Sequence, residues 1–250
     1  MLNALQEYTL RLADNALILG QRLSEWCGHG PILEQDIALT NIALDQIGQA
    51  RNLYQYAAKQ IGGEANEDSL AFLRDAHEFR NLLLVEQPNG HWGDTLVRQF
   101  FFDTFNFFQY DFLRNSQDQE LAAIAGKAIK EITYHAQYSA EWIIRMGDGT
   151  DESHKKVQRS LNDLWMWAGE MFEMDPVHQE MKEKGIGPDY HVILDQWNAK
   201  VNEILDIATL KRPEGDWFQT GGKKGIHTEN LGFILAEMQF LPRAYPESKW

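Results

Sequence analysis

The residues of this chain best suited to chemistry are a carboxylate and an imidazole that lie one helical turn apart. Residues 128–146 repeat apolar and small side chains every three or four positions, which predicts a helix with one buried face. Glu131 and His135 fall one turn apart on that helix. Helical bundles use such pairs as ligands for two metal ions. A di-iron or dimanganese site is therefore the first hypothesis.

A complete two-metal site needs more donors than this segment offers. Bundle proteins take one Glu from each of two helices and a Glu-x-x-His pair from each of the other two. No Glu-x-x-His pair occurs in residues 33–61 or 119–146. The alternative is that Glu131 and His135 form a buried polar pair, and that Asp45 and Arg51 belong to a polar bundle core. The residues alone favour this structural interpretation.

The breaks in the helical pattern divide the chain into two hairpins and a helical C-terminal third. The longest predicted helices cover residues 2–26, 33–61, 95–113 and 119–146. Shorter ones are expected at 70–76, 153–174, 177–184, 190–210 and 231–245. Two long hairpins joined by a long crossover are typical of ferritin-like proteins. We predict an all-α, ferritin-like four-helix bundle with additional C-terminal helices, folded as a single domain over residues 1–250.

The third long helix is aromatic around nearly its whole circumference. Phenylalanine and tyrosine dominate residues 100–112. A helix that is apolar on all sides is buried on more than one side. We therefore expect this helix to contact either a second layer of the protein or a partner chain.

Charge and cysteine content narrow the class of protein. The formal net charge of −14 repels polyanions, so no nucleic-acid partner is expected. The single cysteine, Cys27, cannot form an internal disulfide, which favours a reducing compartment. The N-terminal residues lack the basic leader of a signal peptide, and no apolar stretch is long enough to span a bilayer. We expect a cytoplasmic protein without a membrane partner.

Several segments of the chain resemble one known family. Residues 14–31, 41–53, 81–90, 147–153 and 221–241, among them NIALDQIGQARNL and GGKKGIHTENLGFILAEMQFL, are similar to the C-type subunits of multicomponent phenylacetyl-CoA epoxidases. The resemblance covers essentially the whole chain. It implies a ferritin-like fold and pairing with a catalytic A subunit, which holds the di-iron centre and epoxidises the aromatic ring of phenylacetyl-CoA. The C-type subunit is regarded as structural.

The resemblance also implies which positions correspond to metal ligands in the catalytic subunit. The Glu-x-x-His of the second helix falls on Gln46 and Gln49, and that of the fourth helix on Ile132 and His135. Asp103 lies near the ligand position of the third helix. Neutral amides and an isoleucine cannot hold a pair of irons. We therefore expect vestigial positions, no metal and no cofactor in this chain, with the di-iron centre in the partner subunit.

Three further segments could contact an acyl-CoA substrate. Lys223 and Lys224 stand between glycines, where backbone N–H groups and two cations can attract phosphates. The favoured alternative for this loop is a solvated loop or a salt-bridge donor to the partner. By analogy with the family, an acyl-CoA site shared with the partner is placed at Glu78, Phe79, Arg80 and Asn81, and less firmly at Gln179, Glu180 and Met181.

The sequence thus supports a structural, non-catalytic subunit of a phenylacetyl-CoA epoxidase that stabilises the catalytic A subunit. The alternative is an oxygenase or oxidase in its own right, with two iron or manganese ions and non-standard ligands. Its ligands would be carboxylates that converge from several helices, such as Glu7, Asp14, Asp45, Asp103 or Glu131. A third hypothesis, a CoA-binding module, rests on the lysine loop alone. Iron content of the isolated chain separates the first two.

Overall fold

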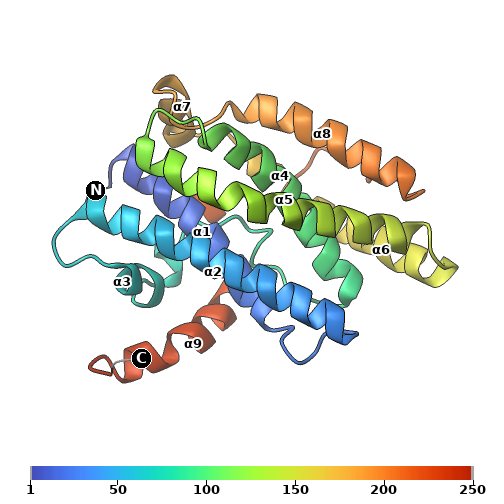
Figure 1. Ribbon diagram of the computed structural model, residues 1–250, viewed down its shortest axis with the longest axis horizontal. Helices are drawn as coiled ribbons and strands as arrows, with labels where there is room; N and C mark the ends of the chain where they lie inside the picture. Colours follow the sequence, from blue (N-terminus) through green and yellow to red (C-terminus); the bar gives the residue numbers. More distant parts are fainter. Residues whose placement is uncertain (1, 249–250) are drawn as a thin grey trace. The chain divides into compact units, whose positions relative to one another are not determined.

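The computed structural model describes residues 2–248, and within that range the regular structure is helical throughout (Figure 1). Two long helical hairpins, a long connection and further C-terminal helices follow one another along the chain, which is the element order of a ferritin-like bundle. The predicted all-α class is therefore confirmed. The backbone forms two compact units, Met1–Gln87 with Gly221–Trp250 and Pro88–Thr220. The prediction of a single domain stays a prediction.

The first unit is built on an antiparallel hairpin of α1 (Ala4–Ser24) and α2 (Leu33–Ile61). A capping box between Asn3 and Gln6 starts α1, because each side chain satisfies a backbone N–H of the other residue. The Gln6 amide also donates to the Gln60 carbonyl at 2.8 Å, which joins the first turn of α1 to the last turn of α2.

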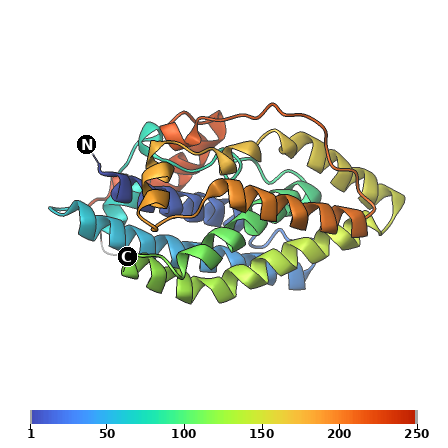
Figure 2. The same ribbon diagram turned by 90° about the horizontal axis from the view of Figure 1, so that it is seen from above.

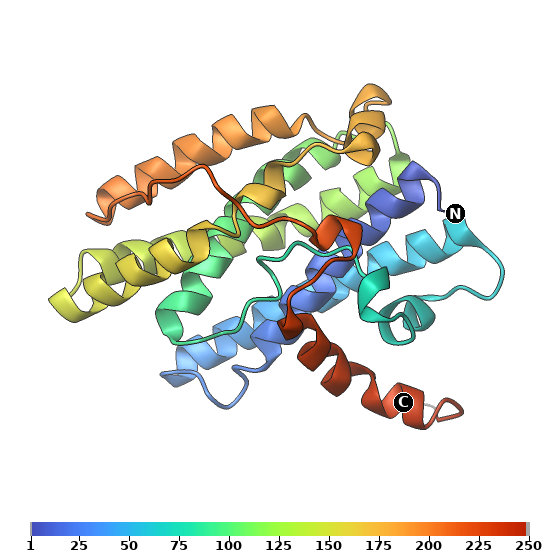
Figure 3. The same cartoon turned by 180° about the vertical axis from the view of Figure 1, so that it is seen from behind.

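The rest of the first unit comes from two distant parts of the sequence. After α2 the chain forms α3 (Glu67–Phe72) and the 3-10 turn η1 (Ala76–Glu78), and then runs without regular structure to residue 87. The C-terminal part adds the 3-10 turn η3 (Gly222–Lys224) and α9 (Glu229–Ala244), which packs against α3 and α1 (Figure 3). Arg243 fastens α9 to the end of α3 by donating to the carbonyls of Leu73 and Arg74 at 3.1 and 2.9 Å.

The second unit begins with the antiparallel hairpin of α4 (Trp92–Leu113) and α5 (Gln119–Gly147). The rings of Trp92 and Trp142 meet edge to face near one end of this hairpin, with centroids 5.5 Å apart. The remaining elements are α6 (Asp151–Trp165), the 3-10 turn η2 (Gly169–Phe172), α7 (Pro176–Glu183) and α8 (Tyr190–Ile207) (Figure 2).

The aromatic character of α4 is explained inside the second unit. One side of α4 packs against α5, and other sides pack against α6 and α8. Phe101 lies 5.6 Å, centroid to centroid, from both Trp165 of α6 and Trp197 of α8. The Trp197 indole N–H also donates to the Phe101 carbonyl at 2.9 Å. Of the two predicted reasons for an all-round apolar helix, the second layer of the same chain is the one observed.

Two local expectations were wrong. The helix predicted over residues 153–174 ends at Trp165, because the segment after α8 packs against the break: Gln219 N–H donates to the Met166 carbonyl at 2.8 Å. A Cβ on Gly169 would lie 2.1 Å from the Phe218 ring, so only glycine fits there. Arg51 is not part of a polar core, since its exposed guanidinium lies 3.7 Å from the Glu67 carboxylate.

None of the helices within residues 2–248 is both long and apolar enough to cross a lipid bilayer.

Candidate functional site

A buried carboxylate, Asp14 of α1, is the centre of the polar structure in the first unit. Its side chain is fully buried and accepts hydrogen bonds from the Tyr54 hydroxyl at 2.5 Å and the Arg80 backbone N–H at 2.8 Å. The Arg74 guanidinium forms a two-pronged ion pair with the same carboxylate. Asp14 therefore joins α1, α2 and the segment after α3 at a single group.

The setting of this ion pair is strongly apolar. The Arg74 guanidinium lies over the Phe79 ring, 4.2 Å from its centroid. Burial by itself would lower the pKa of Arg74, but the charge and hydrogen bond of Asp14, together with Tyr54 and Glu78, outweigh burial and raise it, so the arginine stays charged. Burial, with the Asp14 charge, raises the pKa of Tyr54 well above its usual value, so the tyrosine stays neutral. Such a pair holds the segments that carry its two residues in one arrangement, because removing either partner leaves the other charge buried and uncompensated.

Arg80 extends this network toward the surface. Its guanidinium donates to the Glu7 carboxylate at 3.0 Å and to the carbonyls of His77 and Phe79 at 2.7 and 2.8 Å. Glu7 also pairs with Arg11 at 3.3 Å. Arg80 is thus held in place by protein groups, and its side chain keeps a partial exposure of 24% through which it can meet a ligand.

The glycine–lysine loop packs directly on this segment. A Cβ on Gly222 would lie 2.1 Å from the Asn81 carbonyl oxygen, and one on Gly225 would lie 2.2 Å from that of His77. Gly225 also has a positive φ of 75°. Glycine at both positions allows the two backbones to touch. The structure therefore brings together two predicted binding segments, Glu78–Asn81 and the loop with Lys223 and Lys224.

Only part of this predicted set is available to a ligand. Phe79 and Asn81 are completely buried, and Lys223 is 6% exposed with its carbonyl near Arg11. Glu78, Arg80 and Lys224 reach the surface. Arg80 and Lys224 place two cations beside the carboxylates of Glu7 and Glu78, and two cations on one surface can attract a phosphate group.

A second buried carboxylate, Glu86, joins the C-terminal part of the first unit to residues 79–86 through hydrogen bonds. It accepts from the Asn81 amide at 2.9 Å and from the backbone N–H and hydroxyl of Thr228, both at 2.7 Å. The two ring nitrogens of His227 lie 2.9 Å from the Glu86 carboxylate and 3.0 Å from the Phe79 carbonyl.

This geometry favours the protonated form of His227. Both of its ring nitrogens face acceptors, and only the imidazolium can donate to both. Burial alone would lower the pKa of His227, but the hydrogen bonds with Glu86 and the Phe79 carbonyl, together with the charges of Glu86 and Asp14, outweigh burial and raise it. The ion pair holds residues 227–228 against residues 79–86.

In the second unit, Asp103 of α4 and His135 of α5 are both buried. Burial raises the pKa of Asp103 to about 6, against the lowering influence of His135, Ser139 and Arg98. Ile132, one turn before His135, is completely buried and has no donor atom. Glu131, on which the first metal hypothesis depended, is only half-buried.

In the first unit, Gln46 and Gln49 of α2 are also buried, and the Gln46 amide makes no hydrogen bond with a described residue. A pair of irons in such a bundle calls for carboxylate and imidazole ligands from both hairpins. These positions supply two neutral amides, one carboxyl, one imidazole and one isoleucine, so the donor set does not fit two irons. Within residues 2–248 no three His, Cys, Asp or Glu side chains are grouped as a metal site.

The remaining predicted residues, Gln179, Glu180 and Met181, lie on α7 in the second unit. Met181 is completely buried. The Gln179 amide donates to Glu183 on the same helix, and the Glu180 carboxylate accepts from Lys184, the residue that follows the helix. Their proposed contact with a ligand stays a prediction.

Of the residues that organise the first unit, sequence reasoning singled out Asp14 only as a candidate metal carboxylate, and it missed Arg74, Glu86 and His227. Asp14, Glu86 and His227 lie within the segments that carry the family resemblance, but no local pattern marks Glu86 or His227 as a buried charge. An acid inside an otherwise apolar helical stretch, as at Asp14, was the available signal.

Taken together, the fold and these positions define a class: an all-α protein with the element order of ferritin-like carboxylate proteins and a donor set that does not suit their metal pair. The chain belongs to the family described as phenylacetic acid catabolic protein, which matches residues 1–250. It is 50% identical over 249 residues to the C subunit of the 1,2-phenylacetyl-CoA epoxidase of Escherichia coli (strain K12), covering 100% of each chain. The resemblance seen in the sequence is thereby confirmed.

Proposed function

We propose that this chain is a non-catalytic, structural subunit of an epoxidase that acts on phenylacetyl-CoA, and that it pairs with a related catalytic subunit holding the di-iron centre. The observation that carries the proposal is the donor set: amides at Gln46 and Gln49 and an isoleucine at Ile132, where two irons require charged or imidazole ligands. Full-length identity of 50% to a protein named as a subunit of that epoxidase supports the assignment.

In this function the chain acts through its shape and surface. Buried ion pairs at Asp14 and Glu86 cross-link distant segments of the first unit, and a surface ordered before binding loses little conformational entropy when a partner binds. The proposal places the chain in the cytoplasm, with no metal or cofactor of its own and with no nucleic-acid or membrane partner.

The test compares three preparations: this chain alone, its catalytic partner alone, and the two co-expressed. Iron content and phenylacetyl-CoA epoxidation are measured for each. We expect an iron-free and inert chain that raises the yield or the activity of its partner. Full activity of the partner without this chain would refute the structural role.

The alternative function is catalysis by this chain itself. The observation in its favour is the buried Asp103, whose pKa is raised to about 6 beside His135, since perturbed carboxyl groups are common in active sites. Two irons bound per isolated chain, with activity lost in Asp103→Asn and His135→Ala, would establish this alternative and overturn the first proposal.

An acyl-CoA contact is the finer part of the proposal. The packing of the glycine–lysine loop on residues 77–83 supports a shared site, because it gathers Arg80 and Lys224 on one surface of the first unit. The test measures KM for phenylacetyl-CoA in the assembled complex carrying Lys224→Glu. Lys127→Glu, on the exposed side of α5, is the control with the same change of charge. A raised KM in the first variant alone supports the contact, and equal KM values refute it.

A further inference from the structure

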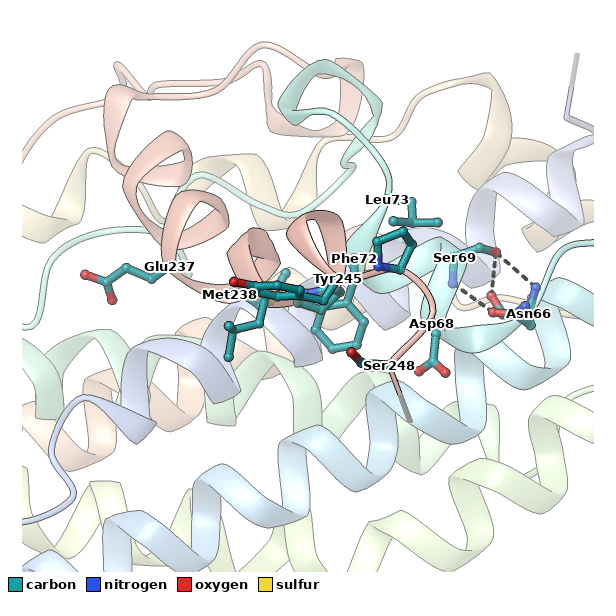
Figure 4. A pocket seen from close by; sticks show the side chains of 12 residues that line it. Asn66, Asp68, Ser69, Phe72, Leu73, Glu237, Met238, Tyr245 and Ser248 are labelled. Atoms are coloured by element: carbon teal, nitrogen blue, oxygen red, sulfur yellow. Dashed lines mark hydrogen bonds between the residues drawn. The ribbon is translucent and has the colours of Figure 1, made fainter. Parts of the chain in front are cut away.

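The C-terminal helix α9 and α3 enclose a groove that the proposed function does not use. The groove has a volume of about 780 Å³ and lies wholly within the first unit (Figure 4). Its floor and walls are mainly apolar, with Phe72 on α3 and Met238, Leu241 and Tyr245 on or next to α9. The volume is in the range of grooves that take a small ligand or a few side chains of a protein.

Large apolar side chains in this groove are open to water. Leu73 is 55% exposed, Leu241 47% and Tyr245 58%. Exposed apolar side chains gathered in one groove are typical of a site that another molecule covers.

The charged groups of the groove are all of one sign. Asp68 and Glu237 line it, and neither makes an ion pair with any residue of the described part of the chain. The neighbouring arginines are already engaged, Arg243 with Asp75 and Arg51 with Glu67. In Figure 4, Phe72, Met238 and Tyr245 lie between Glu237 at one end and Asp68 at the other. An occupant must therefore bring an apolar centre and a positive charge toward each end.

These features exclude several occupants. Polyanions and anionic membranes are repelled by the two carboxylates and by the net charge of −14. A second copy of this chain carries the same negative charge and is disfavoured for the same reason. A protein segment with Lys or Arg on both sides of an aromatic or large aliphatic residue matches both the apolar centre of the groove and the carboxylate at each end.

We propose that the groove between α3 and α9 is a docking site for such a basic–apolar segment of a partner protein. Apolar contact with Phe72, Met238 and Tyr245 supplies most of the binding energy, and Asp68 and Glu237 select the partner and its direction in the groove. The proposal goes beyond the assignment as an epoxidase subunit, and it holds or fails independently of that assignment.

The test uses the full chain and three fluorescein-labelled peptides of equal length. One has a Phe-Leu centre flanked by lysines, the second has the same centre flanked by glutamates, and the third has an Ala-Ala centre flanked by lysines. Binding is followed by fluorescence anisotropy at low and at high salt. We expect only the first peptide to bind well, and its affinity to fall with salt. Equal binding of the glutamate peptide, or no difference between the two lysine peptides, overturns the proposal.

Matched variants locate the binding. Asp68→Lys/Glu237→Lys reverses the charge of the groove, and Asp195→Lys/Asp206→Lys makes the same change of net charge on the exposed side of α8. Loss of about tenfold in affinity is expected for the first pair and little change for the second. All four positions are on the surface, so thermal unfolding should be similar in both variants. Equal weakening by the two pairs means that net charge alone draws the peptide, which contradicts a site in the groove.

Two competing occupants are tested in the same way. Dimerisation of the free chain that is abolished by Leu241→Asp would assign the groove to a second copy and overturn the proposal. A chain ending at Ser248 removes Lys249 and Trp250 as competitors from the same molecule. If it binds the lysine–phenylalanine peptide as the whole chain does, or more tightly, the partner assignment stands, whereas complete loss of binding contradicts it.

Discussion

Replacing Asp103 by Asn is expected to stabilise the protein, although the change removes a buried charged group. The pKa of this carboxyl is raised from 3.8 to about 6 in the folded chain, mainly because burial disfavours the ionised form. Each pKa unit corresponds to about 1.4 kcal/mol, so the ionised carboxylate costs the folded state about 3 kcal/mol above pH 6.

The sign of the effect follows from proton binding. Between pH 4 and 6 the folded protein holds a proton on Asp103 that the unfolded chain has already released, so stability falls as pH rises through this window. Below about pH 4 both states are protonated and the cost disappears. Asn cannot ionise, and Asp103→Asn should therefore gain about 1 to 3 kcal/mol at pH 7 and nearly nothing at pH 4.

Urea unfolding at several pH values measures this difference, with tryptophan fluorescence as the signal, because Trp165 and Trp197 lie in the core of the same unit. Asp195→Asn, an exposed carboxyl on α8, is the control and should show no such pH-dependent gain. A variant less stable than the wild type at pH 7, or a gain independent of pH, would contradict the reasoning from burial.

Three further perturbations test the first unit. Asp14→Asn should lower the free energy of unfolding, measured in urea, by about 3 to 5 kcal/mol, because it leaves Arg74 charged and buried. A decrease below about 1 kcal/mol would show that the ion pair contributes little to stability. His227→Gln should destabilise the protein more at pH 6 than at pH 9. The raised pKa of His227 contributes folding stability that is complete below about pH 6.5 and is lost as the pH rises through the pKa of the folded state. An equal loss of stability at both pH values would contradict a protonated ring. Gly225→Ala should loosen the loop against His77, seen as faster hydrogen exchange at residues 221–228, and unchanged exchange would contradict the close backbone approach.

Much of the fold follows from local sequence pattern. The apolar periodicity of residues 33–61 and 119–146 reproduces the bounds of α2 and α5 almost to the residue, because long amphipathic helices are specified by their own pattern and end at Gly62 and at Gly147. The all-round aromatic surface of α4 predicted either a second layer of the protein or a partner chain, and the structure shows the second layer. The missing Glu-x-x-His pairs and the family resemblance were also visible without coordinates.

Other features depend on residues that meet only in the folded chain. The helix predicted over residues 153–174 ends at Trp165, where Gln219 donates to the Met166 carbonyl, and no local pattern reveals a contact made by a distant segment. Asp14 with Arg74, and Glu86 with His227, are likewise pairs across long sequence separations, so neither member alone indicates the other.

The sequence by itself determined the helical class, the order of the hairpins and the family, since these depend on periodicity and residue type. Only the tertiary structure decided which charges are buried, that the glycine–lysine loop packs on residues 77–83, and that α3 and α9 leave a groove with two carboxylates. The physical reason is that burial, pairing and pKa depend on the groups that surround a side chain, and most of those groups come from other parts of the chain.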